Sequence, residues 1–395
     1  MIKFKIEVII CISFLVLSCL IFSCRNKNPK KIKLTPANEF TYETDFLYNY
    51  KNSKLIYSNE LKKEIIYFAD IVTKKKISFF ELNGKKLYDI PLNYATKNGY
   101  EIDSYEVLNK DSVAVLTLYS NIVFLLNKKG DCLKAVYLDS LIKDMNKNRY
   151  EYYSIKCTSK NNFVLAANWL GSDTSKIPQN SYAHLEYFYR NLPLQPKLVS
   201  LNIFNSIENN VIWGLDSAYS KITKNNELNI FAETNKFLST EKNIYFYSWY
   251  SDKILQINKE NLKLEKKITI DANGQKIGVV PKFLNQKNQN YIFDSVSIGL
   301  QSQASISNVV FDKYRNFFYV IVANKHDIKH KGKGRNYSLL IYDKNFEKIS
   351  EVYLDKELYL PSLLFPSKDG VLIGINSKQN DNYNYAKFKL FKVDY

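Results

Sequence analysis

Apolar and polar residues alternate along several short segments of the chain, and each such segment ends in a polar turn. Residues 243–270 read NIYFYSWYSDKILQINKENLKLEKKITI and show the pattern three times in succession. Alternation with a period of two is typical of a β-strand with one face toward a core. This segment therefore predicts three antiparallel strands joined by short connections.

The same unit recurs elsewhere in the chain. Segments 65–92, 113–138 and 317–354 each hold a strand, a connection of variable length, a second strand, a short turn and a third strand. Asn, Asp and Gly suit these turns because they tolerate the left-handed backbone of tight hairpins. The turns are Asn83-Gly84, Asn127-Lys128-Lys129-Gly130, Asn258-Lys259-Glu260-Asn261 and Asp343-Lys344-Asn345.

Another strand with its own polar turn precedes each unit, so the repeat is four antiparallel strands, A to D. The second strands begin near Ile65, Val113, Phe163, Ile244, Phe317 and Val371. Sheets that pack radially bury both of their faces, and repeats of about this length are typical of propellers. The pattern predicts an all-β fold, a six-bladed β-propeller of four-stranded antiparallel blades. A β-sandwich is the alternative, but it does not predict one turn pattern in every copy.

The final unit lacks a fourth strand, because the chain ends after residues 385–393. We expect residues around 31–50 to supply it, so that an N-terminal strand closes the ring. The predicted organisation is a signal peptide (1–23), a lipidated tether (24–32) and a propeller (33–395).

The N-terminus indicates export. A basic start (MIKFK) precedes the apolar residues 8–23, which end in LIFS before Cys24. This resembles a bacterial lipoprotein signal, with Cys24 as the acylated residue. Cys19 fits the same pattern, and an uncleaved membrane anchor is a further alternative. Arg25 and Lys27 stand where an acidic export tract would lie, so the resemblance favours the periplasmic side of the cell envelope.

Composition narrows the function classes. The chain is 46% hydrophobic and 15% aromatic, enough for a large core, and carries a formal charge of +17. Only five of its 56 basic residues are arginine, which argues for a codon bias and against a nucleic-acid surface. After cleavage Cys132 and Cys157 are the remaining cysteines that are not acylated, and we expect two thiols; a disulfide between them is the alternative.

These features together resemble the six-bladed β-propeller lipoproteins of unknown function that are common in some Gram-negative lineages. The stretch VVFDKYRNFFYVIV (309–322) also looks like the first two strands of NHL-type blades. The resemblance implies a membrane-anchored envelope protein with a propeller fold.

The longest predicted connections follow the second and fourth strands of the units, so they should share one face of a propeller, over its central channel. Binding residues concentrate in loops on rigid scaffolds. Arginine suits carboxylate or phosphate, aromatic rings suit sugars or peptides, and one histidine has a possible general-base setting. The candidates are Arg149, Trp169, His184, Arg190, Trp249, Tyr250 and Arg335. Solvated charges and ordinary packing are the alternatives for these residues.

We expect a lipid-tethered propeller that binds a partner protein, peptide or glycan through this long-loop face, without catalysis. The alternative is a propeller enzyme, of hydrolase or lactonase type, that acts on a carbohydrate or lactone. A structural subunit of an envelope complex is a third possibility. The sequence predicts no catalytic residue, no metal site and no cofactor.

Overall fold

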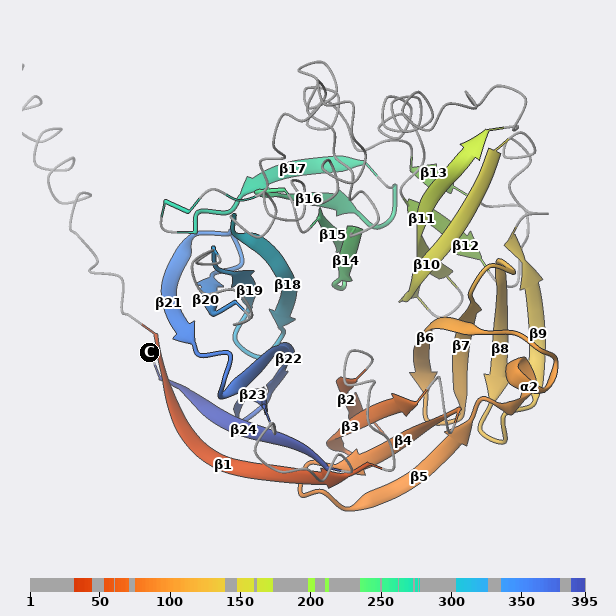
Figure 1. The fold of residues 1–395 in the computed structure, drawn as a ribbon, viewed down its shortest axis with the longest axis horizontal. Helices are drawn as coiled ribbons and strands as arrows, with labels where there is room; N and C mark the ends of the chain where they lie inside the picture. The colour runs from red at the N-terminus through yellow and green to blue at the C-terminus, as the bar shows by residue number, and fades with distance from the viewer. Residues whose placement is uncertain are drawn as a thin grey trace, which may run out of the picture.

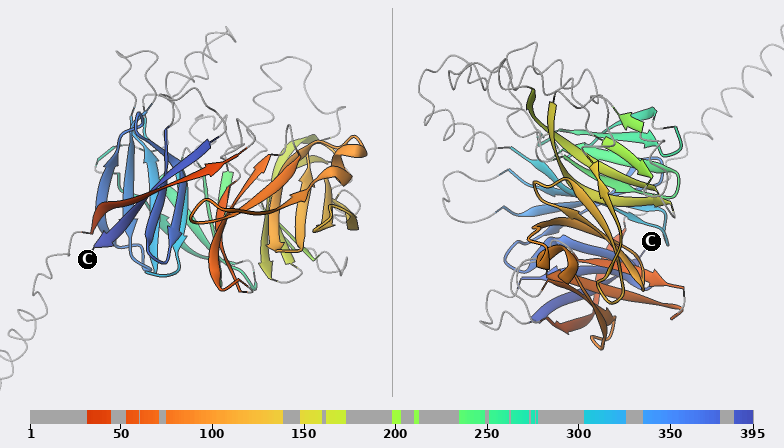
Figure 2. Two further views of the ribbon diagram at one scale, coloured as in Figure 1. Left: turned by 90° about the horizontal axis from the view of Figure 1, so that it is seen from below. Right: turned by 90° about the vertical axis from the view of Figure 1, so that its right-hand side faces the viewer.

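The strands are arranged around a central axis, as Figure 1 shows, and Figure 2 presents the same ring from two sides. The computed structural model describes residues 32–44, 53–59, 61–70, 75–138, 148–159, 162–172, 198–202, 210–212, 235–248, 251–261, 263–272, 274–275, 277, 303–325, 335–376 and 385–394.

The described strands form six antiparallel sheets of four strands each. The strands nearest the axis are β2 (Lys54–Ser58), β6 (Ile102–Asn109), β10 (Asn148–Ser159), β14 (Asn235–Ser239), β18 (Ser305–Asp312) and β22 (Tyr359–Ser367). Next come β3 (Lys63–Asp70), β7 (Ser112–Thr117), β11 (Asn162–Ser172), β15 (Asn243–Ser248), β19 (Phe317–Ala323) and β23 (Gly370–Ile375).

The outer half of each sheet follows the same order. The third strands are β4 (Lys76–Glu81), β8 (Ile122–Asn127), β12 (Leu198–Asn202), β16 (Lys253–Asn258), β20 (Tyr337–Tyr342) and β24 (Tyr385–Asp394). The outermost are β5 (Lys86–Pro91), β9 (Cys132–Tyr137), β13 (Asn210–Ile212), β17 (Leu264–Thr269), β21 (Lys348–Leu354) and β1 (Lys33–Glu43). The predicted all-β propeller of four-stranded antiparallel blades is confirmed.

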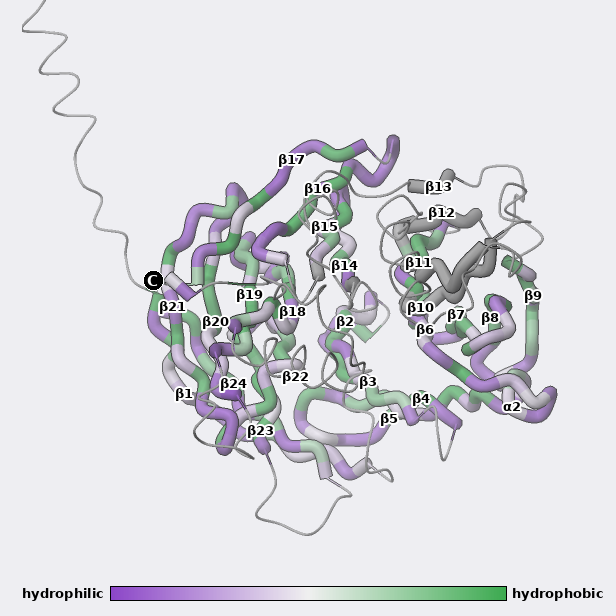
Figure 3. The backbone as a smooth tube through the Cα atoms, turned by 45° about the horizontal axis from the view of Figure 1, so that its top comes forward, coloured by the Kyte–Doolittle hydropathy of each residue, from purple (hydrophilic) through white to green (hydrophobic). Residues whose placement is uncertain are grey.

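Both faces of the sheets are buried, since alternate residues of one strand pack against two different neighbours. In β3, Ile65 and Tyr67 join a core shared with β6–β8, whereas Ile66 and Phe68 join a core shared with β22–β24. All seven residues of β19 are buried. Figure 3 shows the resulting apolar stretch in β19 and β20. Odd- and even-numbered residues of one strand thus pack into two different cores. Since both faces of the strand are buried, such strands are almost wholly apolar.

The N-terminal strand β1 lies beside the last strand of the chain. It pairs antiparallel with β24 from Lys33 opposite Asp394 to Glu43 opposite Tyr385. Tyr42 is fully buried, packs against Phe68, Phe80 and Phe388, and donates a hydrogen bond to the Leu82 carbonyl at 2.9 Å. The strand therefore contacts the first sheet as well as the sheet that it completes.

The four hairpin turns named in the sequence use the expected chemistry. The first side chain of each turn accepts backbone N–H groups, as Asn127 Oδ1 does from Lys129 and Asp131 at 2.8 and 2.9 Å. Gly84 has φ +91°, and a Cβ there would lie 2.5 Å from the Thr41 carbonyl oxygen of β1. Glycine is thus required both by the backbone angle and by the close approach of β1.

Cys132 and Cys157 carry thiols and form no disulfide, as expected. A short helix, α2 (Asn93–Lys97), follows β5 and was not anticipated from the sequence. Among the described residues, no helix has the length and apolar character to cross a membrane. The proposed signal peptide and the acylation site Cys24 lie outside the described residues.

Candidate functional site

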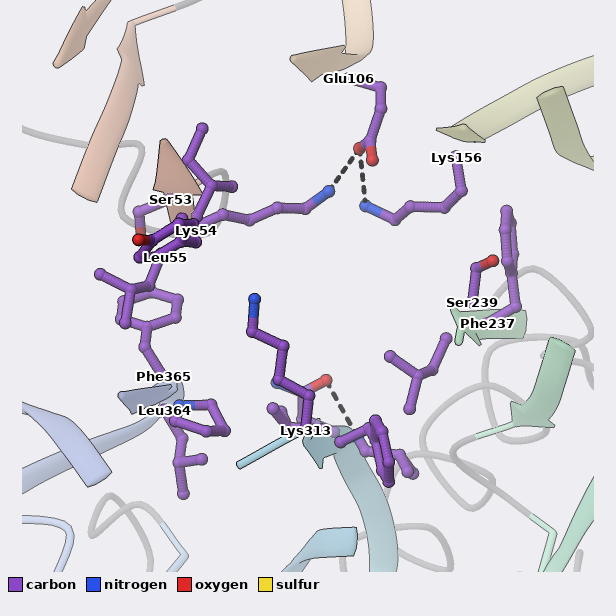
Figure 4. A pocket seen from close by; sticks show the side chains of 18 of the residues that line it. Ser53, Lys54, Leu55, Glu106, Lys156, Phe237, Ser239, Lys313, Leu364 and Phe365 are labelled. Carbon is purple, nitrogen blue, oxygen red and sulfur yellow. Dashed lines mark hydrogen bonds and ion pairs between the residues drawn. The ribbon is translucent and has the colours of Figure 1, made fainter. Parts of the chain in front are cut away.

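A cavity of about 550 Å³ occupies the central channel. Its lining includes residues from all six innermost strands, so every sheet contributes to one site. Figure 4 shows the side chains that surround it. This volume lies in the range of pockets that hold small organic ligands.

The cavity lies toward the face that carries the hairpins between first and second strands. Its lining includes Ser239 at the end of β14, Lys313 and Tyr314 just after β18, and Glu64 near the start of β3. The sequence placed the binding site on the opposite face, where the longer connections lie. The described cavity is therefore a site that the sequence did not indicate.

Two lysines and one glutamate meet at one side of the cavity. The Lys54 ammonium of β2 donates to Glu106 Oε2 of β6. The Lys156 ammonium of β10 lies 3.5 Å from the same oxygen. Figure 4 shows both ammonium groups pointing at this carboxylate. Three neighbouring sheets thus contribute one charged group each to a cluster that we call the Lys54–Glu106–Lys156 cluster.

The electrostatics of this cluster follow from its partial burial. Burial alone would raise the pKa of Glu106, but the ammonium groups of Lys54 and Lys156 outweigh it and hold that pKa below its ordinary value. Burial lowers the pKa of Lys156 to about 7, and repulsion from Lys54 adds to the shift against the attraction of Glu106. Near neutral pH the Glu106 carboxylate is therefore ionised, whereas Lys156 is present in both its protonated and its neutral form.

Lys313 enters the same space from the hairpin after β18. Its ammonium lies over the rings of Tyr57 and Tyr314, 5.7 and 5.2 Å from their centroids. The Tyr314 hydroxyl donates to Glu64 Oε1 at 2.6 Å, and the Lys368 backbone N–H donates to the same oxygen at 3.0 Å. Among the described residues Lys313 has no carboxylate within ion-pair distance, and Figure 4 shows its ammonium pointing into the cavity.

Apolar side chains form much of the remaining wall. They come from four of the sheets and include Leu55, Phe237, Leu238, Phe311, Leu364 and Phe365. Figure 4 places Phe237 and Phe365 on different sides of the space. A few polar groups that converge on an otherwise apolar cavity are the usual arrangement of a small-molecule site.

The structure describes three of the seven residues proposed from the sequence. Arg335 is half-buried and donates to Ser305 Oγ at 3.0 Å and to the Gln303 carbonyl at 2.8 Å, so its guanidinium holds the start of β18. Arg149 lies in β10 and Trp169 in β11, where their strands pair at the same end. Four candidates lie outside the described residues: His184, Arg190, Trp249 and Tyr250. Their roles stay predictions.

The sequence held little signal for the cavity residues. Lys54, Glu106 and Lys156 are charged residues within first strands, and Lys313 follows one. In a propeller the first strand of each sheet lies nearest the axis, so residues of these strands can face the central channel. Lysine is so common in this chain, however, that no single lysine stands out: 56 residues are basic and five of those are arginine. The described residues contain no group of three or more His, Cys, Asp or Glu side chains that could hold a metal ion.

No family model matches the chain, and no curated protein matches it either. Among solved structures, the chain is similar to a member of the DUF4221 family from Bacteroides vulgatus. The two share 14% identity with a TM-score of 0.70, over 93% of this chain and 99% of that one.

Two further solved structures match the chain over most of its length. A candidate exported protein from Bacteroides fragilis has 11% identity and a TM-score of 0.53, over 93% of this chain and 96% of that one. A luciferin-regenerating enzyme has 10% identity and a TM-score of 0.45, over 90% and 97%. At 14% and 11% identity, the similarity to the two Bacteroides proteins shows the fold alone.

Proposed function

We propose that this chain is an exported, lipid-anchored β-propeller of the bacterial cell envelope that binds a small molecule in its central channel. The signal-like N-terminus before Cys24 supports export and acylation, with the periplasmic side favoured. The likeness to a candidate exported protein from Bacteroides fragilis supports the same placement. Catalysis is not required by this proposal.

In this proposal the six sheets are the six blades of one ring, and β1 closes it. The pairing of β1 with β24 and the packing of Tyr42 against the first sheet support closure. A closed ring holds the innermost strands in a fixed arrangement, so the channel is formed before a ligand arrives. Preformed sites bind with a smaller entropy cost.

The observation that carries the proposal is the cavity of about 550 Å³ that draws residues from every sheet. Its lining combines apolar walls with converging ammonium and carboxylate groups. A cavity with that composition, at the axis of a rigid scaffold, is suited to one small organic ligand.

A neutral fluorescent probe tests channel binding. N-phenyl-1-naphthylamine brightens in an apolar site, and we expect saturable binding to the wild-type protein. Ser362 lines the cavity and is exposed, so Ser362→Trp should fill the channel without disturbing the core. Ser120→Trp, in an exposed turn away from the cavity, is the matched control. Equal binding by both variants would remove the channel as the site.

Two other functions stay open as proposals. The long-loop face could bind a protein, peptide or glycan, with Arg149 and Arg190 among its residues. An enzyme that acts on a carbohydrate or lactone is the catalytic alternative, and Glu106 beside Lys156 would be its acid–base pair. Turnover of a lactone panel that is lost in Glu106→Gln would favour the enzyme; binding without turnover favours the binding protein.

A further inference from the structure

We infer that the ligand of the channel is an organic anion with an apolar body, whose acidic group is held by Lys313 and by the Lys54–Glu106–Lys156 cluster. This inference rests on the proposed channel binding and names the chemical class of its ligand. Three observations support it: the charge that converges on the cavity, the position of Lys313, and the walls on either side.

Positive charge exceeds negative charge in the cavity. Lys54 and Lys156 share the single carboxylate of Glu106. The other lining carboxylate, Glu64, already accepts two hydrogen bonds, from the Tyr314 hydroxyl and the Lys368 N–H. The Lys54 ammonium has three donors, so it keeps donors for a further acceptor after binding Glu106. A bound anion would also favour the protonated form of Lys156, which then offers donors of its own.

The ammonium of Lys313 is an exposed positive charge that points into the cavity and can bind an anion. Its contacts within the described residues are the faces of Tyr57 and Tyr314. Aromatic faces hold an ammonium in place without neutralising its charge. The side chain is thus oriented toward the channel, and its charge is available to a carboxylate, sulfonate or phosphate.

The apolar walls of the cavity indicate that the rest of the ligand is apolar. Apolar surface within the same cavity comes from Phe237, Leu238, Phe311 and Phe365. Figure 4 places Phe237 and Phe365 on different sides of the space. A small inorganic anion would leave this surface in contact with water. An anion with an aromatic or branched body would cover it, and that burial adds to the affinity in proportion to the area covered.

A matched pair of probes tests the inference. 8-Anilinonaphthalene-1-sulfonate has nearly the same rings as N-phenyl-1-naphthylamine but carries a sulfonate. We expect the sulfonate probe to bind the wild-type protein more tightly, and added salt to weaken the sulfonate probe alone. Inorganic phosphate should compete only weakly, because it cannot contact the apolar walls.

Variants of Lys313 test whether its ammonium binds the sulfonate. Lys313→Met should weaken sulfonate binding about tenfold to a hundredfold, the loss expected for one charge-assisted hydrogen bond, and should not weaken the neutral probe to that extent. Lys313→Glu should weaken the sulfonate probe further. Lys344→Met is the control, since Lys344 is an exposed lysine of the hairpin between β20 and β21.

The outcomes separate this inference from the proposed function. If both probes bind the wild-type protein equally and Lys313→Met changes neither, the channel binds small molecules but does not select anions, and the inference is wrong. If neither probe responds to Ser362→Trp, the proposed channel function is wrong. If phosphate competes as strongly as the sulfonate probe binds, the apolar part of the inference is wrong.

Discussion

Replacement of Glu106 by glutamine removes the one negative charge between Lys54 and Lys156 while it keeps the shape of the side chain. The exposed fractions of the three side chains are 35% for Lys54, 14% for Glu106 and 25% for Lys156. Loss of one partner of a fully buried ion pair costs about 3–5 kcal/mol. Because these side chains are partly exposed and solvent screens their charges, we expect about 2 kcal/mol for Glu106→Gln.

The loss of stability in Glu106→Gln should depend on pH, and the direction of this dependence follows from the pKa of Lys156. The pKa of this lysine is lowered to about 7 in the folded protein, from an ordinary value of 10.5. Between those values the unfolded chain binds more protons than the folded chain, so stability rises with pH across this window and the full penalty is present below it. Without Glu106 the pKa of Lys156 should fall further, so the variant should lose most stability in mildly acidic solution and recover part of it in mildly alkaline solution.

Urea unfolding, followed by circular dichroism at about pH 6 and about pH 9, measures this difference. Glu347→Gln, in an exposed turn, is the matched control. The double variant Glu106→Gln/Lys156→Met should recover most of the loss, because Lys54 then faces no second ammonium. Equal stability of Glu106→Gln and Glu347→Gln at both pH values would refute the electrostatic description of the cluster.

Three further predictions test other parts of the molecule. Gly84→Ala should cost about 1–3 kcal/mol more than Gly99→Ala, because both glycines have positive φ but only Gly84 lies against β1; equal losses in thermal unfolding would argue against the position of β1. Arg335→Met should lower the free energy of unfolding by about 1–3 kcal/mol, while the affinity for the sulfonate probe stays unchanged in fluorescence titration, since this guanidinium holds Ser305 and Gln303. Cys24→Ala should abolish acylation and release the protein from membranes, as shown by fractionation and mass spectrometry; loss of acylation in Cys19→Ala instead would move the site.

Much of the fold could be predicted because its signals are local. The six second strands foreseen near Ile65, Val113, Phe163, Ile244, Phe317 and Val371 are β3, β7, β11, β15, β19 and β23. The turns at Asn83, Asn127, Asn258 and Asp343 were recognised because their side chains accept neighbouring backbone N–H groups. Strand alternation and turn chemistry are both set within a few residues, so one sequence suffices to find them.

The cavity could not be predicted in the same way. The two lysines of the cluster, Lys54 and Lys156, are each about 50 residues from Glu106 in sequence. Only the circular arrangement of the sheets brings both ammonium groups to the Glu106 carboxylate. The face was predicted from the lengths of the connections, and these lengths do not indicate which side chains of the innermost strands line a cavity. The arginines were favoured for their rarity, and the structure shows Arg335 donating hydrogen bonds to Ser305 and Gln303 of its own chain. Its role in ligand binding stays a prediction.

A crystal structure of the protein with 8-anilinonaphthalene-1-sulfonate tests channel binding most directly. We expect the sulfonate within hydrogen-bond distance of Lys313 Nζ and the naphthalene ring against Phe237 or Phe365. A dye molecule bound on the long-loop face, with only water beside Lys313, would contradict the proposal that the channel is the ligand site.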